Sequence, residues 1–309
     1  MPELPEVETV RRGLNRVTLA QPIQGGSVLL ERTVAHPVFV REFLTGLEQC
    51  TISRWYRRGK YLLGHLVKHH QDEKATCSEP LDLLATAEDI EYAASHADHA
   101  GWLGVHLRMT GQLLWLHQSD PVQKHCRVRL FFPSQRELRF VDQRTFGQMW
   151  WVPPDRSPTE VMGKGYAALG PEPLSSAFTV DGLRQALKRR HRPIKNALLD
   201  QSIVAGIGNI YADESLFLSS IRPTKLCDRL TRKQIEALHA KIVEVLKSSI
   251  GEGGTTFSDF RDIEGINGNY GSMAWVYGRD GTPCRVCGEP IQRVKMAGRS
   301  THFCKTCQK

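Results

Sequence analysis

The chain opens with Met1-Pro2-Glu3, a start that could support covalent chemistry. If Met1 is removed, Pro2 presents a secondary amine, and an α-amino group titrates near pH ~8, so a useful fraction is unprotonated at neutral pH. A neutral amine can attack an electrophilic carbon and hold the substrate as an iminium ion. The carboxyl group of Glu3 comes next in the chain and can move protons. The alternative interpretation is that Pro2 and Pro5 only begin a helix.

Four cysteines near the end of the chain have the spacing of a metal site. Cys284-x-x-Cys287 and Cys304-x-x-Cys307 are separated by sixteen residues. Two such pairs can supply four thiolates to one tetrahedral zinc ion, with a β-hairpin spanning the interval. We therefore expect one structural Zn²⁺ per chain rather than a redox pair. The remaining cysteines lack this spacing and are expected to be ordinary residues: Cys50, Cys77, Cys126 and Cys227.

Two further segments could bind phosphate. The run from Gly206 to Glu214 contains Gly-x-Gly-Asn; glycines allow close backbone approach, and free amides at a helix start attract phosphate. Asn209 could contact the phosphate or merely cap that helix, and both alternatives stay open. The hairpin expected between the cysteine pairs is basic, which suits a phosphate clamp or a groove reader. Its cations are Arg293, Lys295 and Arg299, with Arg299 near the tip.

Composition limits the class of protein. With 309 residues, two or three domains are expected, and a net charge of +8 indicates a polyanionic partner. No apolar run approaches the ~18 residues that a membrane helix needs. The acidic N-terminus has no apolar core of a signal peptide. We therefore expect a cytoplasmic protein with no membrane partner and with reduced cysteines.

The elements that must position these residues differ along the chain. Apolar residues recur at helical steps over residues 5–17, which predicts a helix that holds residues 2 and 3 at its start. From residue 24 to 151, short apolar runs separated by turns predict strands in a sandwich or barrel. Residues 152–158 are typical of a linker. Helices are expected beyond it, over 183–190, 193–201, 212–218 and 231–250, the last opening with a capping box at Thr231 and ending at Gly251.

An acidic segment interrupts the strands. Residues 68–100 carry eight acidic side chains against two lysines, a net charge of −6, so the rest of the chain carries +14. We interpret the segment as a surface excursion between two strands, facing away from a polyanion, with a short helix near residues 85–94. Its histidines could suggest a metal site, but a solvated loop is favoured because no cysteine or fixed scaffold accompanies them. These histidines are His69, His70, His96 and His99.

Taken together, the motifs resemble those of the bacterial formamidopyrimidine-DNA glycosylase family. The resemblance covers almost the whole chain outside residues 68–100. It rests on the Pro-Glu-Leu-Pro-Glu-Val-Glu-Thr start, the glycine-rich run and the cysteine pairs. Three internal motifs add to it: Gly59-Lys60-Tyr61-Leu62, His106-Leu107-Arg108-Met109-Thr110-Gly111 and Asp142-Gln143-Arg144-Thr145-Phe146-Gly147.

The resemblance implies an α+β protein of two lobes with damaged double-stranded DNA in the cleft between them. The N-terminal lobe would be a catalytic β-sandwich with flanking helices, over residues 1–152. A helix-two-turn-helix domain would follow over 159–251, and a lid loop with the zinc-ribbon hairpin over 252–309. The implied activity is excision of oxidised purines followed by strand cleavage at the abasic site, and a monomer is expected.

The resemblance also implies roles for single residues. Pro2 would attack C1′ of the damaged nucleotide, and Glu3 would act as general acid and base. Lys60, Asn209 and Arg299 would bind the phosphates that flank the lesion. His125 stands where the family has a phosphate-contacting histidine.

Three side chains would fill the space that the flipped base leaves. They are Met109, Arg144 and Phe146, although without the resemblance Met109 and Phe146 would be assigned to the core. An unbranched Met and an aromatic ring suit insertion between bases, and Arg144 can donate to the orphaned cytosine. The chain departs from the family at Arg108, usually a small residue, and at Thr145, usually an arginine. The loop from Phe260 to Tyr270 occupies the place of the lid over the damaged base.

The sequence leaves two rival functions open. One is an endonuclease VIII-type glycosylase, which removes oxidised pyrimidines by the same chemistry; Leu4 and the Met109–Arg144–Phe146 set favour the purine enzyme. The other is a non-catalytic zinc-ribbon DNA-binding protein, which would explain the charge and the cysteines but not the N-terminus.

Overall fold

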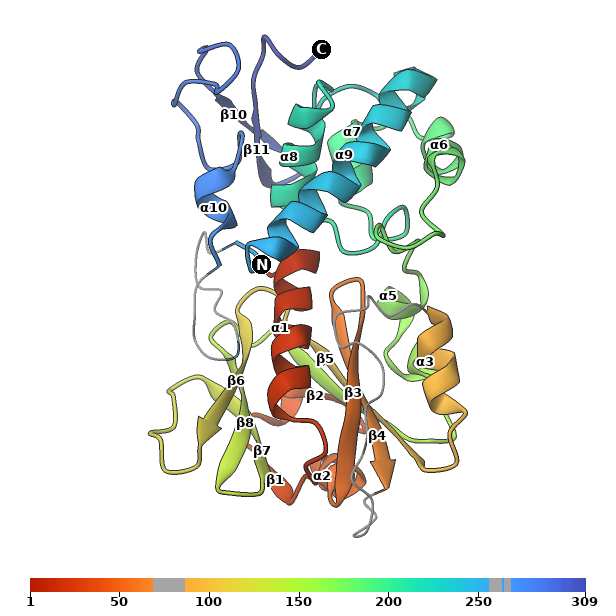
Figure 1. Ribbon diagram of the computed structural model, residues 1–309, viewed down its shortest axis with the longest axis vertical. Helices are drawn as coiled ribbons and strands as arrows, with labels where there is room; N and C mark the ends of the chain where they lie inside the picture. Colours follow the sequence, from red (N-terminus) through yellow and green to blue (C-terminus); the bar gives the residue numbers. More distant parts are fainter. Residues whose placement is uncertain (69–86, 256–262, 264–267) are drawn as a thin grey trace. The chain divides into compact units, whose positions relative to one another are not determined.

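The computed structural model describes residues 1–68, 87–255, 263 and 268–309 (Figure 1). These residues form two compact units. The first unit comprises the described residues of Met1–Pro2, Glu6–Ala167 and Ser258–Gly268, and the second those of Glu3–Pro5, Ala168–Phe257 and Asn269–Lys309. The three-domain division expected from the sequence stays a prediction.

Helix α1 (Leu4–Val17) confirms the helix expected over residues 5–17. Its apolar stripe of Val7, Val10 and Leu14 is fully buried. The same helix and Thr18, the residue that follows it, are fixed to strand β3 (Cys50–Arg58) by side-chain hydrogen bonds. Asn15 accepts the Trp55 backbone N–H at 2.7 Å, and Thr18 Oγ1 accepts the Trp55 indole N–H at 2.8 Å. Hydrophobic burial and paired polar groups therefore fix this helix along its length.

A buried ion cluster lies on the same helix. Glu8 binds Arg11 with two hydrogen bonds, at 2.7 and 3.0 Å, and both side chains are fully buried. Arg57 Nε lies 3.2 Å and Arg12 Nε 3.1 Å from the same carboxylate. Burial alone would raise the pKa of Glu8, but Arg11, Arg57 and Arg12 together outweigh it and lower the pKa below its usual 4.5.

Two sheets make up most of the first unit. The five-stranded sheet has the order β2-β9-β5-β4-β3, and the four-stranded sheet has the order β1-β7-β8-β6. The bounds of the other strands are β1 (Gly25–Val28), β2 (Val34–His36), β4 (Tyr61–Lys68), β5 (His99–His106), β6 (Gly111–His117), β7 (Cys126–Phe132), β8 (Arg136–Asp142) and β9 (Gln148–Val152). All pairings within these sheets are antiparallel except that of β2 with β9, which is parallel.

Both sheets contribute to one hydrophobic core. Strand β7 alternates buried and half-buried residues along its length, as expected for a sheet with one face in the core. Leu103 and Trp55 of one sheet belong to the same buried cluster as Val128 and Phe140 of the other. The α+β class with a β-rich N-terminal part is thereby confirmed.

Short helices flank these sheets. They are η1 (Glu31–Thr33), α2 (Val40–Leu47), α3 (Ala87–Ala94), α4 (Pro158–Val161) and α5 (Lys164–Ala167). Helix α3 confirms the short helix expected in the acidic segment, and it buries Ile90 and Ala93. Residues 69–86, which include His69, His70 and Cys77, lie outside the described part of the chain.

The second unit is helical with a small hairpin. Its elements are α6 (Val180–Lys188), α7 (Ile194–Leu198), α8 (Asn209–Leu218), η2 (Cys227–Arg229), α9 (Arg232–Gly251), α10 (Tyr270–Met273), β10 (Gln292–Met296) and β11 (Arg299–Phe303). The capping box predicted at Thr231 is present. Helix α8 begins three residues before its expected start, because a helix buried on nearly every side has no apolar stripe to mark its ends.

Within the described ranges, no helix combines the length and the apolar composition that a membrane crossing requires.

We predict that Glu8→Gln lowers the free energy of unfolding by about 3 kcal/mol, because it leaves the buried Arg11 guanidinium without its counter-charge. Denaturant unfolding at pH 7 measures this change. Glu236→Gln, which removes the carboxylate of a solvent-exposed pair with Arg232, is the matched control and should have no measurable effect.

The Glu8 contribution should also depend on pH. Because folding lowers the pKa of Glu8, its stabilisation is present above the unfolded-state pKa and is lost as the pH falls through the lower folded-state value. The difference between the wild type and Glu8→Gln should therefore shrink in acid. A difference that stays constant from pH 7 to pH 3 would show that the carboxylate charge is not its source.

Candidate active site and zinc ribbon

The Glu3 carboxylate is bound at the start of helix α8. Glu3 is buried, its Oε1 accepts the Ile210 N–H at 2.9 Å, and its Oε2 accepts the Tyr211 N–H at 3.4 Å. These amides belong to the first helical turn, which has no intrahelical partner for them, and the helix dipole makes this end positive. The helix therefore holds Glu3 as an oriented carboxylate directly after Pro2.

Two glycines make room for this contact. The Leu4 N–H donates to the Gly206 carbonyl at 3.0 Å. Gly206 has φ +86°, and a Cβ placed there would lie 2.6 Å from Leu4 Cδ1. A Cβ on Gly208 would lie 2.3 Å from Glu3 Cδ. The expectation that the amides at this helix start are free to attract phosphate is therefore wrong for Ile210 and Tyr211, which bind Glu3 instead.

A fully buried lysine lies in the same network. Lys195 Nζ is 2.7 Å from Asp213 Oδ1 and donates to the Ser300 carbonyl at 2.8 Å. Burial lowers the pKa of Lys195, although the charges of Asp213 and Glu3 act in the opposite direction. The sequence reasoning missed this residue. One feature of the sequence could have indicated it. Lys195 lies one turn before Leu198 in a short helix, so helical spacing predicts that its side chain is buried with the apolar residues.

Asn209 contacts the hairpin rather than capping its helix. The N-cap of α8 is Gly208, so the capping alternative for Asn209 is wrong. Asn209 Nδ2 donates to the Ser300 carbonyl at 2.9 Å, the oxygen that Lys195 also binds. Its Oδ1 is buried and has no hydrogen-bond partner among the described residues.

These contacts hold the hairpin that carries Arg299. Strands β10 and β11 pair through a two-residue turn, Ala297 at φ +46° and Gly298 at φ +77°, which matches a type I′ turn. The His302 N–H donates to Asp213 Oδ2 at 2.9 Å. Arg299 is the first residue after the turn and is exposed, as expected for a side chain at the hairpin tip.

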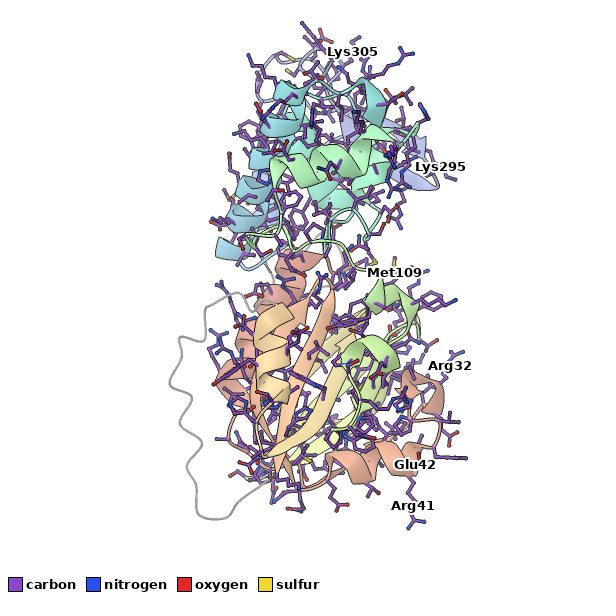
Figure 2. All side chains as sticks on the ribbon, turned by 90° about the vertical axis from the view of Figure 1, so that its right-hand side faces the viewer. Arg32, Arg41, Glu42, Met109, Lys295 and Lys305 are labelled. Atoms are coloured by element: carbon purple, nitrogen blue, oxygen red, sulfur yellow. The ribbon has the colours of Figure 1, made fainter. Side chains whose placement is uncertain are left out.

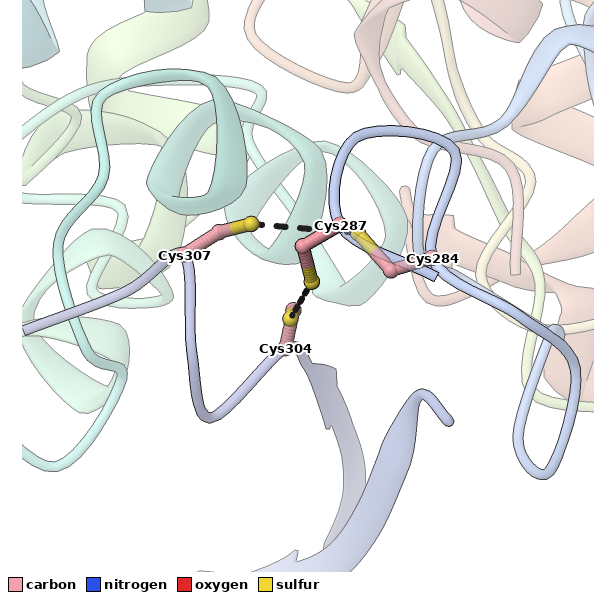
Figure 3. Close-up of side chains that lie close together, drawn as sticks. All are labelled: Cys284, Cys287, Cys304 and Cys307. Atoms are coloured by element: carbon pink, nitrogen blue, oxygen red, sulfur yellow. Dashed lines mark hydrogen bonds between the residues drawn. The ribbon is translucent and has the colours of Figure 1, made fainter. Parts of the chain in front are cut away.

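The four predicted zinc ligands lie together (Figure 3). All four sulfur atoms are within 4.8 Å of one another, with 3.9 Å between Cys284 and Cys307 and 3.4 Å between Cys287 and Cys304. Tetrahedral ligands at a Zn–S distance of ~2.3 Å are separated by ~3.8 Å. The Val286 N–H also points to Cys284 Sγ at 3.5 Å. The cluster thus fits one structural zinc ion, and the ion would hold the hairpin ends together.

In the first unit, Met109 and Phe146 lie on the surface. They are 38% and 54% exposed, so the alternative that places them in the core is wrong. Figure 2 shows the Met109 side chain at the surface of this unit. Both residues line a pocket of ≈ 510 Å³ together with Met1, the residue that precedes Pro2. The Arg144 guanidinium lies over the Phe146 ring, 5.2 Å from its centroid.

Asp142 fixes the turn that presents Arg144 and Phe146. Its carboxylate accepts the backbone N–H of Arg144 at 3.2 Å and that of Gly147 at 2.7 Å. It also accepts the Thr110 hydroxyl, which joins this turn to the one that carries Met109. The motif beginning at Asp142 is therefore a preorganised loop.

The two residues that depart from the family both have positive φ. Arg108 has φ +52° and Thr145 has φ +59°, values that are uncommon for residues with side chains. Arg108 Nη2 donates to Gln148 Oε1 at 3.1 Å, and Arg32 donates to the Thr145 hydroxyl. Both arginines line the pocket of Met109 and Phe146, so cations flank these exposed side chains.

The remaining candidates of the first unit lie at turns and strand ends. Lys60 is buried and follows Gly59, which has φ +56° in the β3–β4 turn. His106 accepts the Arg108 N–H at 2.9 Å; burial, followed by Arg108 and Lys60, lowers the pKa of His106 to about 3, so its ring is neutral. The His125 carbonyl accepts the Asp142 N–H at 2.9 Å.

The predicted site residues thus fall into two groups. Pro2, which is buried, belongs to the first unit with Lys60, His125 and the Met109–Arg144–Phe146 set. Glu3, Asn209, Arg299 and the four cysteines belong to the second. The expected lid loop, residues 260–270, lies largely outside the described residues; of its described part, Ile263 packs into the first core and accepts the Trp115 N–H at 3.1 Å.

Known sequence families match three parts of the chain. Residues 1–149 match the formamidopyrimidine-DNA glycosylase N-terminal domain, and residues 169–261 match the H2TH domain of the same glycosylases. Residues 281–309 match a zinc finger found in FPG and IleRS. The last match contains all four clustered cysteines.

Whole-chain comparisons agree with these matches. Formamidopyrimidine-DNA glycosylase of Acaryochloris marina is 57% identical over 308 residues, covering 100% of this chain and 99% of the relative; that of Nostoc punctiforme is 56% identical, with 100% and 96% covered. Among solved structures, a Lactococcus lactis FPG mutant bound to Fapy-dG-containing DNA matches with 32% identity, a TM-score of 0.83 and all of both chains covered. MutM (FPG) of Thermus thermophilus matches with 34% identity and a TM-score of 0.79, and the match covers 99% of this chain and 98% of that chain. The chain belongs to the formamidopyrimidine-DNA glycosylase family.

Proposed function

We propose that this protein is a base-excision repair enzyme that removes oxidised purines from double-stranded DNA and then cleaves the strand at the resulting abasic site. The substrates would be 8-oxoguanine and ring-opened formamidopyrimidines. The relatives named above carry the name formamidopyrimidine-DNA glycosylase, and a solved neighbour holds Fapy-dG-containing DNA. Damaged DNA is accordingly the partner that these relationships favour.

The observation that carries the proposal is the position of Glu3. Its carboxylate is buried and bound to two backbone amides of α8, so it keeps one orientation next to Pro2. A DNA-binding module without catalysis would need no such carboxylate at its terminus. Met1 lines the same pocket as Met109 and Phe146, so removal of Met1 would expose the Pro2 nitrogen near the side chains that we assign to the vacated base position.

The chemistry follows from an amine beside a carboxyl group. The Pro2 nitrogen would attack C1′ of the flipped nucleotide, and the bond from C1′ to the damaged base would break. Glu3 would protonate the ring oxygen as the sugar opens, which leaves an iminium ion on Pro2. The iminium acidifies the neighbouring C2′ proton, so the 3′ phosphate and then the 5′ phosphate would leave by elimination. An oriented nucleophile can lower such a barrier by ~7–11 kcal/mol.

The other predicted residues would position the substrate. We assign Lys60, Asn209 and Arg299 to the phosphates that flank the lesion, and His125 to a further phosphate. The exposed Met109 and Phe146 would enter the base stack, and Arg144 would pair with the orphaned cytosine. Arg32 and Arg108 lie beside this set and add positive charge for the DNA backbone.

Oxidised pyrimidines are a second candidate substrate class. A wild-type Lactococcus lactis FPG structure contains an oxidised pyrimidine in its DNA, and it matches this chain with 32% identity and a TM-score of 0.82 over the whole of both chains. We infer that pyrimidines are the slower substrates, because the chain carries Leu4 and the Met109–Arg144–Phe146 set.

We also infer that the protein acts as a monomer in the cytoplasm. Every residue assigned to the reaction comes from one chain, so no partner subunit has to complete the site. Chromosomal DNA is the substrate, which places the enzyme at the bacterial nucleoid when bound.

The proposed nucleophile predicts that borohydride traps the enzyme on DNA that contains 8-oxoguanine opposite cytosine, with the adduct on the Pro2 nitrogen by peptide mapping. A chain with one glycine inserted between Met1 and Pro2 should trap at least about a hundredfold more slowly, because Pro2 then becomes an amide. The insertion should leave DNA affinity intact.

Two controls sharpen this experiment. Glu3→Gln should slow trapping by about 10²–10⁴-fold because it removes proton transfer, whereas the exposed Glu236→Gln should not. A thymine-glycol duplex should react more slowly than the 8-oxoguanine duplex; the reverse order would favour the pyrimidine enzyme. Equal trapping by the native and the extended terminus would exclude Pro2 as the nucleophile.

The Glu3 position gives a second prediction. Gly208→Ala should reduce the single-turnover excision rate about a hundredfold with little change in DNA affinity, because its methyl group must displace the Glu3 carboxylate. Gly251→Ala is the matched control, since a Cβ there meets no atom within 4 Å. Equal rates for the two variants would contradict the role of Glu3.

The ribbon gives a third prediction. Removal of zinc with a strong chelator should weaken DNA binding at least tenfold, because the hairpin that carries Arg299 loses the ion that joins its ends. Added zinc should restore it. Cys287→Ser should have the same effect without chelator, and Cys50→Ala should have none; full DNA binding by the metal-free protein would refute the structural role of the ion.

A further inference from the structure

Three histidines of the first unit form a cluster that the proposed repair reaction does not use. His65 lies on β4 and is buried, His99 begins β5, and His96 is exposed in the segment that joins α3 to β5. The rings of His65 and His99 are stacked with centroids 5.0 Å apart, and those of His65 and His96 are 6.3 Å apart. The sequence shows no fixed scaffold for the histidines of the acidic segment. In the structure, His65 and strands β4 and β5 supply one.

Hydrogen bonds orient two of these rings. Ser53 Oγ lies 2.7 Å from His65 Nδ1 and can also donate to the His65 carbonyl at 3.4 Å; on this basis we assign the ring proton of His65 to Nδ1, which makes Nε2 the nitrogen that can bind a metal. His96 Nδ1 lies 3.1 and 3.2 Å from the Tyr92 and Ala93 carbonyls, so Nε2 is the nitrogen that we assign to the metal. Polar partners on the far nitrogen are the usual support of metal-binding histidines.

We propose that His65, His96 and His99 bind a second metal ion, a first-row divalent transition metal such as Zn²⁺, distinct from the ribbon ion. His65 Nε2 and His99 Nδ1 are 2.9 Å apart and share one proton. When the metal takes its place, that proton moves to His99 Nε2. Both imidazole rings therefore stay neutral, and no proton is released to solvent. Imidazole nitrogens select such metals over Mg²⁺ or Ca²⁺.

The geometry needs modest movement. Two nitrogens on one zinc ion are roughly 3.4 Å apart, so the His65–His99 pair must open by about 0.5 Å. Among the described residues only the four cysteines already have three or more ligand atoms within 4.8 Å of one another, so His96 must turn inward. Its ring is exposed, and turning inward exchanges its contacts with the Tyr92 and Ala93 carbonyls and the Tyr92 ring for a bond to the metal.

The environment of the three histidines favours neutral imidazole rings and leaves a path by which a metal ion can reach them. Burial, followed by the rings of His99 and His96, lowers the pKa of His65 to about 3, and burial lowers the pKa of His99, so protons do not compete with a metal at pH 7. His99 also lines a pocket of ≈ 400 Å³ with Glu91, which gives the ion access and a nearby carboxylate. Bound metal would fasten the end of α3 to strands β4 and β5.

Metal counting on the full-length protein without a histidine tag tests this site independently of repair activity. The zinc-loaded protein is dialysed against Co²⁺ or Zn²⁺ and its metal content is measured. We expect two ions per chain, and the second Co²⁺ should show ligand-field absorption without a thiolate charge-transfer band. His96→Ala and His99→Ala should each weaken the second site at least tenfold, and the double variant should bind one ion.

His191→Ala is the matched control, because His191 is 82% exposed and lies outside the cluster; it should keep both ions. A thermal unfolding curve unchanged from the wild type shows that each variant is folded, and His96→Ala changes only an exposed side chain. One ion per chain in the wild type, or a second ion that survives the double substitution, would overturn the proposal.

Discussion

The bond between the Glu3 carboxylate and the first amides of α8 is the constraint on which the rest of the site depends. A carboxylate needs hydrogen-bond donors when it is buried, and a helix start has donors that lack partners. Each therefore satisfies the other, with Ile210 N–H at 2.9 Å. The two glycines before the helix follow from the same contact, since a side chain at either position would collide with Glu3 or Leu4.

Opposite charges extend this arrangement to the hairpin. Burial lowers the pKa of Lys195, and the negative charges of Asp213 and Glu3 oppose this shift; Lys195 pairs with Asp213 at 2.7 Å. Asp213 in turn accepts the His302 N–H of β11, while Lys195 and Asn209 both donate to the Ser300 carbonyl. A residue at the N-terminus is thus linked through helices α7 and α8 to the strand that carries Arg299. The cysteine cluster holds the other end of the same hairpin.

Much of this structure could be predicted from local patterns. Three features depend on residues close in sequence, and the spacing of those residues predicts each feature. They are the helix at residues 4–17, the capping box at Thr231 and the zinc site. Helical spacing in the sequence places the start of α8 three residues late, because burial on nearly every side removes the periodic signal. The Gly-Ile-Gly run was assigned to phosphate although it accommodates Glu3, a partner more than two hundred residues away.

Buried polar residues were the least predictable. Lys195 and His65 each act through contacts with distant strands or helices, and nothing in their sequence neighbourhood specifies those partners. Met109 and Phe146 show the reverse case: residue type alone favours burial, whereas the family resemblance predicts side chains that can enter the base stack, and the structure shows both exposed. Functional sites are where such local rules fail most often, since chemistry requires buried charge and exposed apolar surface.

Amide hydrogen exchange at Ile210 tests the central contact most directly. This amide lies in the first turn of α8, where no backbone carbonyl can protect it, and Glu3 is its acceptor. We expect slow exchange in the wild type and exchange at least tenfold faster in Glu3→Ala, with the amide of Glu214 deeper in α8 unchanged. Equal protection of Ile210 in both proteins would show that Glu3 is not held by the helix.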